Sequence, residues 1–167
     1  MSLKEAILAE FDAEVAVTRK VFDRLPDQAF GWKPHERSMS LGALATHLAQ
    51  IPHWGTTILQ RDGYDMPAVA RVPGAYSKAS RAEVIEMFDG HASEVRRTLL
   101  GMTDAELYAP WSLTSGGSVV MSLPKIAALR RFLLNHLVHH RGQLTVYLRM
   151  HNVPLPPLYG PTADEGM

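Results

Sequence analysis

Four stretches of the sequence place an apolar residue at every third or fourth position, which is the spacing of one face of an α-helix. They cover residues 3–25, 41–59, 81–102 and 124–151. Ser40 and Ser80 immediately precede the second and third stretches, as helix N-caps do. Long amphipathic helices bury their apolar faces against one another. The sequence therefore predicts an all-α fold, an up-down four-helix bundle.

The segments between these stretches contain the residues that end helices. We expect residues 27–39 to form a connector and residues 61–79 to form a long connection with turns. Residues 104–123 surround a Gly116-Gly117 pair, which predicts a short hairpin or an extended excursion before the last helix. Pro52 predicts a kink or a break in the second helix. The tail, residues 153–167, contains four prolines and should be extended along the surface or pair with another chain.

The length, charge and composition of the chain limit its domain count and the partners and ligands that it can have. The chain has 167 residues, for which one domain covering residues 1–167 is the default. Lys+Arg and Asp+Glu both number 17, and this balance argues against a nucleic-acid partner. Cysteine is absent, so disulfides, thiolate ligands and cysteine nucleophiles are excluded. Any metal ligand must therefore be His, Asp, Glu or water.

Localisation follows from the absence of two signals. The first residues carry acids within their apolar pattern, which is unlike a signal peptide or a membrane anchor. The apolar runs are shorter than the roughly 20 residues that a membrane span requires. We therefore expect a cytoplasmic protein with no membrane partner.

The last stretch contains three of the eight histidines within a segment of only five residues, 136–140. His136 and His140 are four residues apart, so on a helix they share one face, and apolar neighbours indicate that this face is buried. Two imidazoles one turn apart can hold a divalent metal ion, whereas His139 lies on the flank. A catalytic site of this type also needs a third protein ligand and an open position.

The third ligand has two candidates on apolar helix faces, His47 and His91. Either one could equally be a histidine that is hydrogen-bonded within the core. Gln50 and Gln143 each follow a proposed ligand by three residues and are candidates to orient its ring, or are buried glutamines bonded to backbone. Arg141 is a weaker candidate for the mouth of the site, because it follows His140 directly and can equally face solvent or another chain.

Two further features concern the surroundings of the histidines. Gly142 interrupts the last helix and leaves room for a helix or a ligand to approach. Trp54, Tyr147 and the Gly116-Gly117 excursion are the candidates for the mouth of the site.

The motifs LATHLAQ around His47, NHLVHHRGQL from Asn135 to Leu144, WKP at Trp32, and LYGPTADE near the end resemble the DinB/YfiT-like superfamily of metalloenzymes. The likeness covers nearly the whole chain. It implies a four-helix bundle, often dimeric, in which His47, His136 and His140 bind a divalent metal ion. Imidazole ligands alone do not select among Zn²⁺, Ni²⁺ and Fe²⁺.

The resemblance also implies an activity. Characterised members of that family include S-transferases and isomerases that depend on glutathione, mycothiol or bacillithiol. We therefore expect a small-molecule substrate and a metal-dependent transfer to a low-molecular-weight thiol. A metal-dependent hydrolase and a non-catalytic metal-binding stress-response protein are the alternatives.

Overall fold

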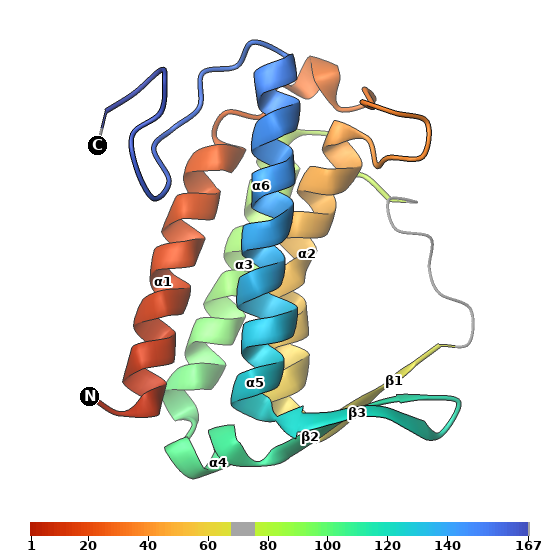
Figure 1. The fold of residues 1–167 in the computed structure, drawn as a ribbon, viewed down its shortest axis with the longest axis vertical. Coiled ribbons are helices and arrows are strands. Elements are labelled where there is room, and N and C mark those ends of the chain that lie inside the picture. Colours follow the sequence, from red (N-terminus) through yellow and green to blue (C-terminus); the bar gives the residue numbers. More distant parts are fainter. Residues whose placement is uncertain (68–75, 167) are drawn as a thin grey trace.

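Long helices pack side by side along the longest dimension of the molecule, and a small sheet lies at one end (Figure 1). The structure, a computed structural model, describes residues 1–67 and 76–166. Its helical segments are α1 (Leu3–Phe22), η1 (Asp27–Ala29), α2 (Leu41–Gln60), α3 (Arg81–Gly101), α4 (Asp104–Tyr108), α5 (Lys125–Leu129), η2 (Arg130–Leu134) and α6 (Asn135–Met150). Its strands are β1 (Gly63–Met66), β2 (Pro110–Ser115) and β3 (Ser118–Pro124).

The helix starts confirm the predicted N-caps. The hydroxyl of Ser40 accepts a hydrogen bond from the Ala43 amide at 3.2 Å, and that of Ser80 accepts one from the Glu83 amide at 3.3 Å. These bonds satisfy amides that have no partner within the helix. They fix where α2 and α3 begin, and hence which faces those helices turn to the core. The α2 helix continues through Pro52 without a break.

The core lies between the long helices. The rings of Phe22 and Phe88 join α1 to α3 at an edge-to-face angle, with their centroids 5.1 Å apart. The α2 helix is the most deeply buried element, and its leucines and isoleucines contact the other long helices. Apolar burial on this scale is the main source of stability for helices that pack together.

The prediction of an all-α four-helix bundle is wrong, because the fold is mixed and contains a three-stranded sheet. The expected hairpin is present: β2 and β3 pair antiparallel around Gly116 and Gly117, whose φ angles of +57° and +79° suit glycine. The strand that the sequence analysis missed is β1, which pairs parallel to β2 with Gly63 opposite Ser112. It lies in the connection predicted over residues 61–79, of which residues 68–75 are outside the described part of the chain.

Gly63 explains how β1 can approach β2. A Cβ atom at this position would lie 2.6 Å from the carbonyl oxygen of Ser112, which is closer than real Cβ contacts come. Glycine is therefore the residue that allows this parallel pairing.

The predicted last helix is divided by a π-helical turn. The chain passes from α5 through η2, Arg130–Leu134, into α6. Such turns shift the faces of the helix that follows. The buried residues of α6 are Leu137, Arg141, Leu144 and Leu148. His136 and His140 are half-buried at the edge of that face, whereas the periodicity indicated that the face they share is the buried one.

The C-terminal tail folds back beside α1 (Figure 1). Asp164 pairs with the guanidinium of Arg149 and accepts a hydrogen bond from the Leu155 amide at 2.9 Å. Glu165 pairs with Arg24 just beyond α1, at 2.6 Å.

In the two described segments, no helix combines the length and the apolar character needed to cross a membrane.

Candidate metal centre

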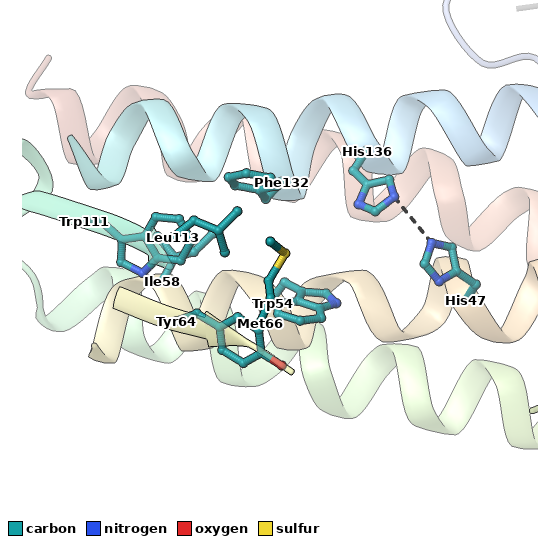
Figure 2. Close-up of a pocket in the computed structure, with 9 residues that line it drawn as sticks. All are labelled: His47, Trp54, Ile58, Tyr64, Met66, Trp111, Leu113, Phe132 and His136. Carbon is teal, nitrogen blue, oxygen red and sulfur yellow. Dashed lines mark hydrogen bonds between the residues drawn. The ribbon is translucent and has the colours of Figure 1, made fainter. Parts of the chain in front are cut away.

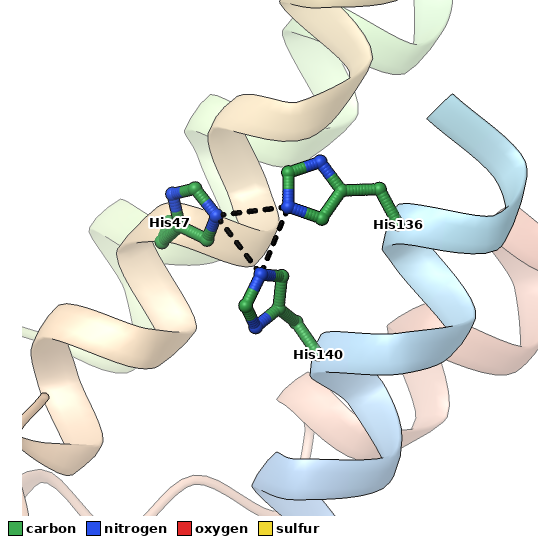
Figure 3. Close-up of side chains that lie close together, drawn as sticks. All are labelled: His47, His136 and His140. Atoms are coloured by element: carbon green, nitrogen blue, oxygen red, sulfur yellow. Dashed lines mark hydrogen bonds between the residues drawn. The ribbon is translucent and has the colours of Figure 1, made fainter. Parts of the chain in front are cut away.

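Three histidine rings meet between α2 and α6 with their Nε2 atoms facing one another (Figure 3). The Nε2 atom of His47 lies 3.3 Å from that of His136 and 3.2 Å from that of His140. The Nε2 atoms of His136 and His140 are 2.9 Å apart. Among the described residues, this is the cluster whose donor atoms could hold a metal ion. The structure thus brings together the three histidines that the sequence analysis selected.

The spacing of these nitrogens fits a bound cation. Each Nε2 atom carries either one proton or one lone pair in the ring plane. Three such atoms can face one another either through N–H···N hydrogen bonds between rings in different tautomers or with their lone pairs directed at a shared cation. Imidazole nitrogens bind zinc at about 2.0–2.1 Å, so two ligands of a tetrahedral ion lie about 3.3 Å apart. The observed separations of 2.9 to 3.3 Å are close to that value.

Burial favours the neutral form of all three rings. Desolvation lowers the pKa of His140 to about 4; the hydrogen bond with Gln143 opposes this shift and the nearby histidines add to it. Burial lowers the pKa of His47, helped by the nearby His136. Burial also lowers the pKa of His136, although a hydrogen bond to the Phe132 backbone opposes the shift. Neutral imidazole is the form that binds metals, so the lone pairs are available at neutral pH.

A glutamine orients one of the rings. The Nδ1 atom of His140 lies 2.7 Å from Oε1 of Gln143. Because an amide oxygen only accepts, Nδ1 carries the proton and Nε2 carries the lone pair that faces the cluster. Of the two alternatives for Gln143, this hydrogen bond favours the orienting residue. Gln50, the equivalent candidate beside His47, is exposed.

The remaining histidines on these helices lie outside the cluster. His91 donates from Nδ1 to the Ala49 carbonyl at 3.2 Å, which makes it a hydrogen-bonded histidine that joins α3 to α2. Its ring lies 5.4 Å from that of His53, an exposed residue. His139 is exposed and stands against the outer side of His140.

An apolar pocket of about 220 Å³ opens beside the cluster (Figure 2). His47 and His136 lie at one end of it, and side chains from α2, η2, β1 and β2 form the rest. Its lining residues are His47, Trp54, Ile58, Tyr64, Met66, Trp111, Leu113, Phe132 and His136. Trp54, a candidate for the mouth of the site, thus lines this pocket.

The other predicted features lie elsewhere. The Tyr147 hydroxyl contacts the Met39 carbonyl at 3.4 Å, and the Tyr147 ring packs against Trp32. The Gly116-Gly117 turn is the far tip of the hairpin (Figure 1). A Cβ atom on Gly142 would meet nothing within 4 Å. No residue among those described therefore packs closely against this glycine.

The side chain of Arg141 is buried, with only 1% of its surface exposed, and it does not face solvent. It binds the Glu14 carboxylate at 2.6 Å and the Thr18 hydroxyl at 3.0 Å. It also contacts the Tyr159 hydroxyl, so it joins α6 to α1 and to the tail. Sequence reasoning missed this role, because the partners Glu14 and Thr18 lie on α1, more than 120 residues away in the sequence.

Two solved structures have the same fold. A DinB-like protein from Bacillus cereus ATCC 10987 superposes with a TM-score of 0.72 at 22% identity, over 93% of this chain and 97% of that one. The DinB-like protein YjoA from Bacillus subtilis superposes with a TM-score of 0.69 at 19% identity, over 92% and 96% of the two chains. At this identity the likeness shows the fold alone.

The amino-acid sequence is similar both to a protein family and to an individual protein. The family model of the DinB superfamily matches residues 10–144. The uncharacterised protein YrdA of Bacillus subtilis strain 168 is 25% identical over 168 residues, which cover 95% of this chain and 89% of that protein.

Proposed function

The chain belongs to the DinB superfamily, and on that premise we propose that it is a metal-dependent enzyme that transfers a group to a low-molecular-weight thiol. The observation that carries the proposal is the meeting of three Nε2 atoms within 3.3 Å of one another beside an apolar pocket. Three protein ligands leave a fourth position of a tetrahedral ion for the reactant, as catalytic sites do.

His47, His136 and His140 would hold the ion. A divalent metal ion in that position would lower the pKa of a bound thiol and so supply the nucleophilic thiolate at neutral pH. Gln143 keeps the His140 ring in the tautomer whose Nε2 lone pair faces the cluster. The apolar walls of the pocket exclude water, which otherwise competes with the thiol for the second reactant.

Hydrolysis is the alternative chemistry, and one feature of the pocket disfavours it. A water nucleophile generally requires a base to accept its proton. Among the residues that the structure describes, the pocket lining includes no Asp or Glu. Thiol transfer requires no such base once the thiolate has formed.

The test uses protein loaded separately with Zn²⁺, Ni²⁺ and Fe²⁺. Glutathione, mycothiol and bacillithiol are each supplied with monochlorobimane, and the fluorescent thioether is measured. The proposal expects turnover that requires both the metal and a thiol, that is lost in His47→Ala, and that is retained in His53→Ala, an exposed histidine on the same helix. Turnover of ester or amide substrates by water alone would support the hydrolase instead.

The non-catalytic alternative, a metal-binding stress-response protein, is tested by metal content and melting temperature. If His47→Ala and His140→Ala lose the metal and also unfold, the ion has a structural role. If the metal is lost while the fold remains, the ion serves a reaction or a ligand. We expect the second result, because the core between the helices is apolar and does not depend on the three rings.

Three further predictions accompany the proposed function. A thiol cofactor of this kind is held reduced in the cytoplasm, which is where we expect the protein to act. The resemblance to the family also predicts a homodimer, which sedimentation analysis can test. We expect the whole chain to unfold as one domain.

A further inference from the structure

The sheet that sequence reasoning missed forms one wall of the pocket. Residues alternate between the two faces of a strand. Tyr64 and Met66 of β1 therefore lie on the same face as Trp111 and Leu113 of β2, and Tyr64 is the direct cross-strand partner of Leu113. All four side chains line the pocket (Figure 2).

On β1 and β2, the opposite face of the sheet is polar. Asp65 accepts a hydrogen bond from the Thr114 hydroxyl at 2.7 Å, and the hydroxyls of Ser112 and Ser122 lie 3.3 Å apart. The apolar residues of β1 and β2 are therefore gathered on the face that meets the helices. This amphipathic sheet turns its apolar side toward the space beside the histidines.

The helical wall has the same character. Trp54 and Ile58 lie one turn apart on α2, and Phe132 of η2 lies one turn before His136. The rings of Trp54 and Tyr64 meet edge to face at 4.9 Å, and those of Trp111 and Phe132 are 5.7 Å apart. Aromatic rings are thus present on both walls, and such rings favour a further ring at an edge or an offset face.

Charge and volume limit what the pocket can hold. The described lining contains no Asp, Glu, Lys or Arg, so a charged group buried there would lose its hydration without a partner. An apolar cavity of about 150 Å³ binds benzene. The volume here, about 220 Å³, has room for one aromatic ring with a small substituent.

We propose that this pocket holds the second reactant of the transfer, and that this reactant is a neutral electrophile with a single aromatic ring. The inference rests on the function proposed above and names its substrate class. The ring lies between Trp54, Leu113 and Phe132, and the reactive carbon points to the end occupied by His47 and His136. The thiolate sulfur forms a bond to that carbon, the bond from carbon to the leaving group breaks, and the leaving group departs with the electron pair. The thiol proton passes to solvent.

Binding is measured without turnover, by quenching of tryptophan fluorescence. The probe is 4-nitrotoluene, a neutral single-ring compound that quenches indoles and has no leaving group. Two of the three tryptophans, Trp54 and Trp111, line the pocket. Trp32 packs instead against Tyr147 and His151, so Trp32→Phe removes the tryptophan outside the pocket. Protein freed of metal by a chelator is used, so that the result does not depend on the metal or the thiol.

In the Trp32→Phe background we expect saturable quenching. Leu113→Phe should weaken the binding of 4-nitrotoluene at least tenfold, because the larger side chain fills the pocket. Met66→Phe repeats the test from β1. Val120→Phe is the matched control: it adds the same ring to the same hairpin at a side chain that is 54% exposed and outside the lining. Quenching that does not saturate, or equal affinities in Leu113→Phe and Val120→Phe, would overturn the proposal even if thiol transfer is found.

A second readout keeps the two proposals separate. With an active thiol, kcat/KM for benzyl chloride should fall at least tenfold in Leu113→Phe, while that for methyl iodide stays within twofold. Equal losses for the two electrophiles contradict the substrate class and leave the thiol-transfer proposal intact. A third outcome is saturable binding of 4-nitrotoluene that Leu113→Phe weakens, without any thiol transfer. This result supports the ligand class of the pocket and contradicts only the proposed transfer chemistry.

Discussion

The Nε2 atoms of His47 and His140 lie 3.2 Å apart, although 93 residues separate the two histidines in the sequence. The contact exists because α2 and α6 pack side by side and present these residues at the same level (Figure 3). The cluster is therefore a product of the tertiary fold. A substitution that shifts either helix should affect the cluster even when all three histidines are present.

Gln143→Ala should weaken zinc binding about 10- to 100-fold, because the His140 ring loses the partner that fixes its tautomer. Gln50→Ala is the control, because Gln50 is also exposed and also follows a histidine of the cluster by three residues, whereas the hydrogen bond between glutamine and imidazole is made by Gln143. Zinc affinity is measured by competition with a chromophoric chelator. Equal affinities in the two variants would show that the amide of Gln143 has no orienting role.

Arg141→Met should lower the free energy of unfolding by about 3–5 kcal/mol, because it leaves the Glu14 carboxylate largely buried without its cation. Arg130→Met removes a surface pair with Glu10 and should cost about 0–1 kcal/mol. Urea unfolding measures both. Adding Glu14→Leu to Arg141→Met should recover part of the loss, and failure to recover any would contradict a buried-charge penalty.

Gly63→Ala should destabilise the protein by about 1–3 kcal/mol, because its Cβ atom has no room beside the Ser112 carbonyl. It should also weaken 4-nitrotoluene binding, since β1 carries Tyr64 and Met66. Gly90→Ala is the opposite case: the position is helical and open, so alanine should stabilise by about 1 kcal/mol. Thermal unfolding with the fluorescence titration checks both variants, and equal effects would contradict the tight β1–β2 approach.

Asp164→Asn tests the attachment of the tail through its pH dependence. The Arg149 guanidinium, and then the Leu155 amide, lower the pKa of Asp164 from 3.8 to about 2. A lowered pKa means that the carboxylate contributes stability above pH 3.8 and loses it as the pH falls toward 2. Wild type should therefore melt above Asp164→Asn at pH 6, and the difference should shrink below pH 3.8. A difference that grows on acidification would contradict this pairing.

The helices, and the shared helix face of His136 and His140, were predictable because both depend on local periodicity. An N-cap serine and apolar residues at helical spacing placed the start of α2 at Leu41, where the structure has it. The same period put His136 and His140 on one side of α6. His47 was placed opposite them by the resemblance to a family, since periodicity alone left His91 as a rival.

The sheet and the buried Arg141 were not predictable, because both depend on contacts between distant residues. The β1 strand has four residues and pairs parallel with a strand about 50 positions away, as in the hydrogen bond from Thr114 to Asp65 at a separation of 49. So short a segment carries no periodic signal of its own. Arg141 is buried because Glu14 and Thr18 of α1 face it, and no pattern within α6 predicts such partners.

The most direct test of the proposed metal centre is an anomalous difference map from a crystal of the protein soaked in zinc. The account predicts one peak between α2 and α6, about 2.0–2.1 Å from the Nε2 atoms of His47, His136 and His140. Density that is empty at that position while zinc is bound by other side chains would contradict it.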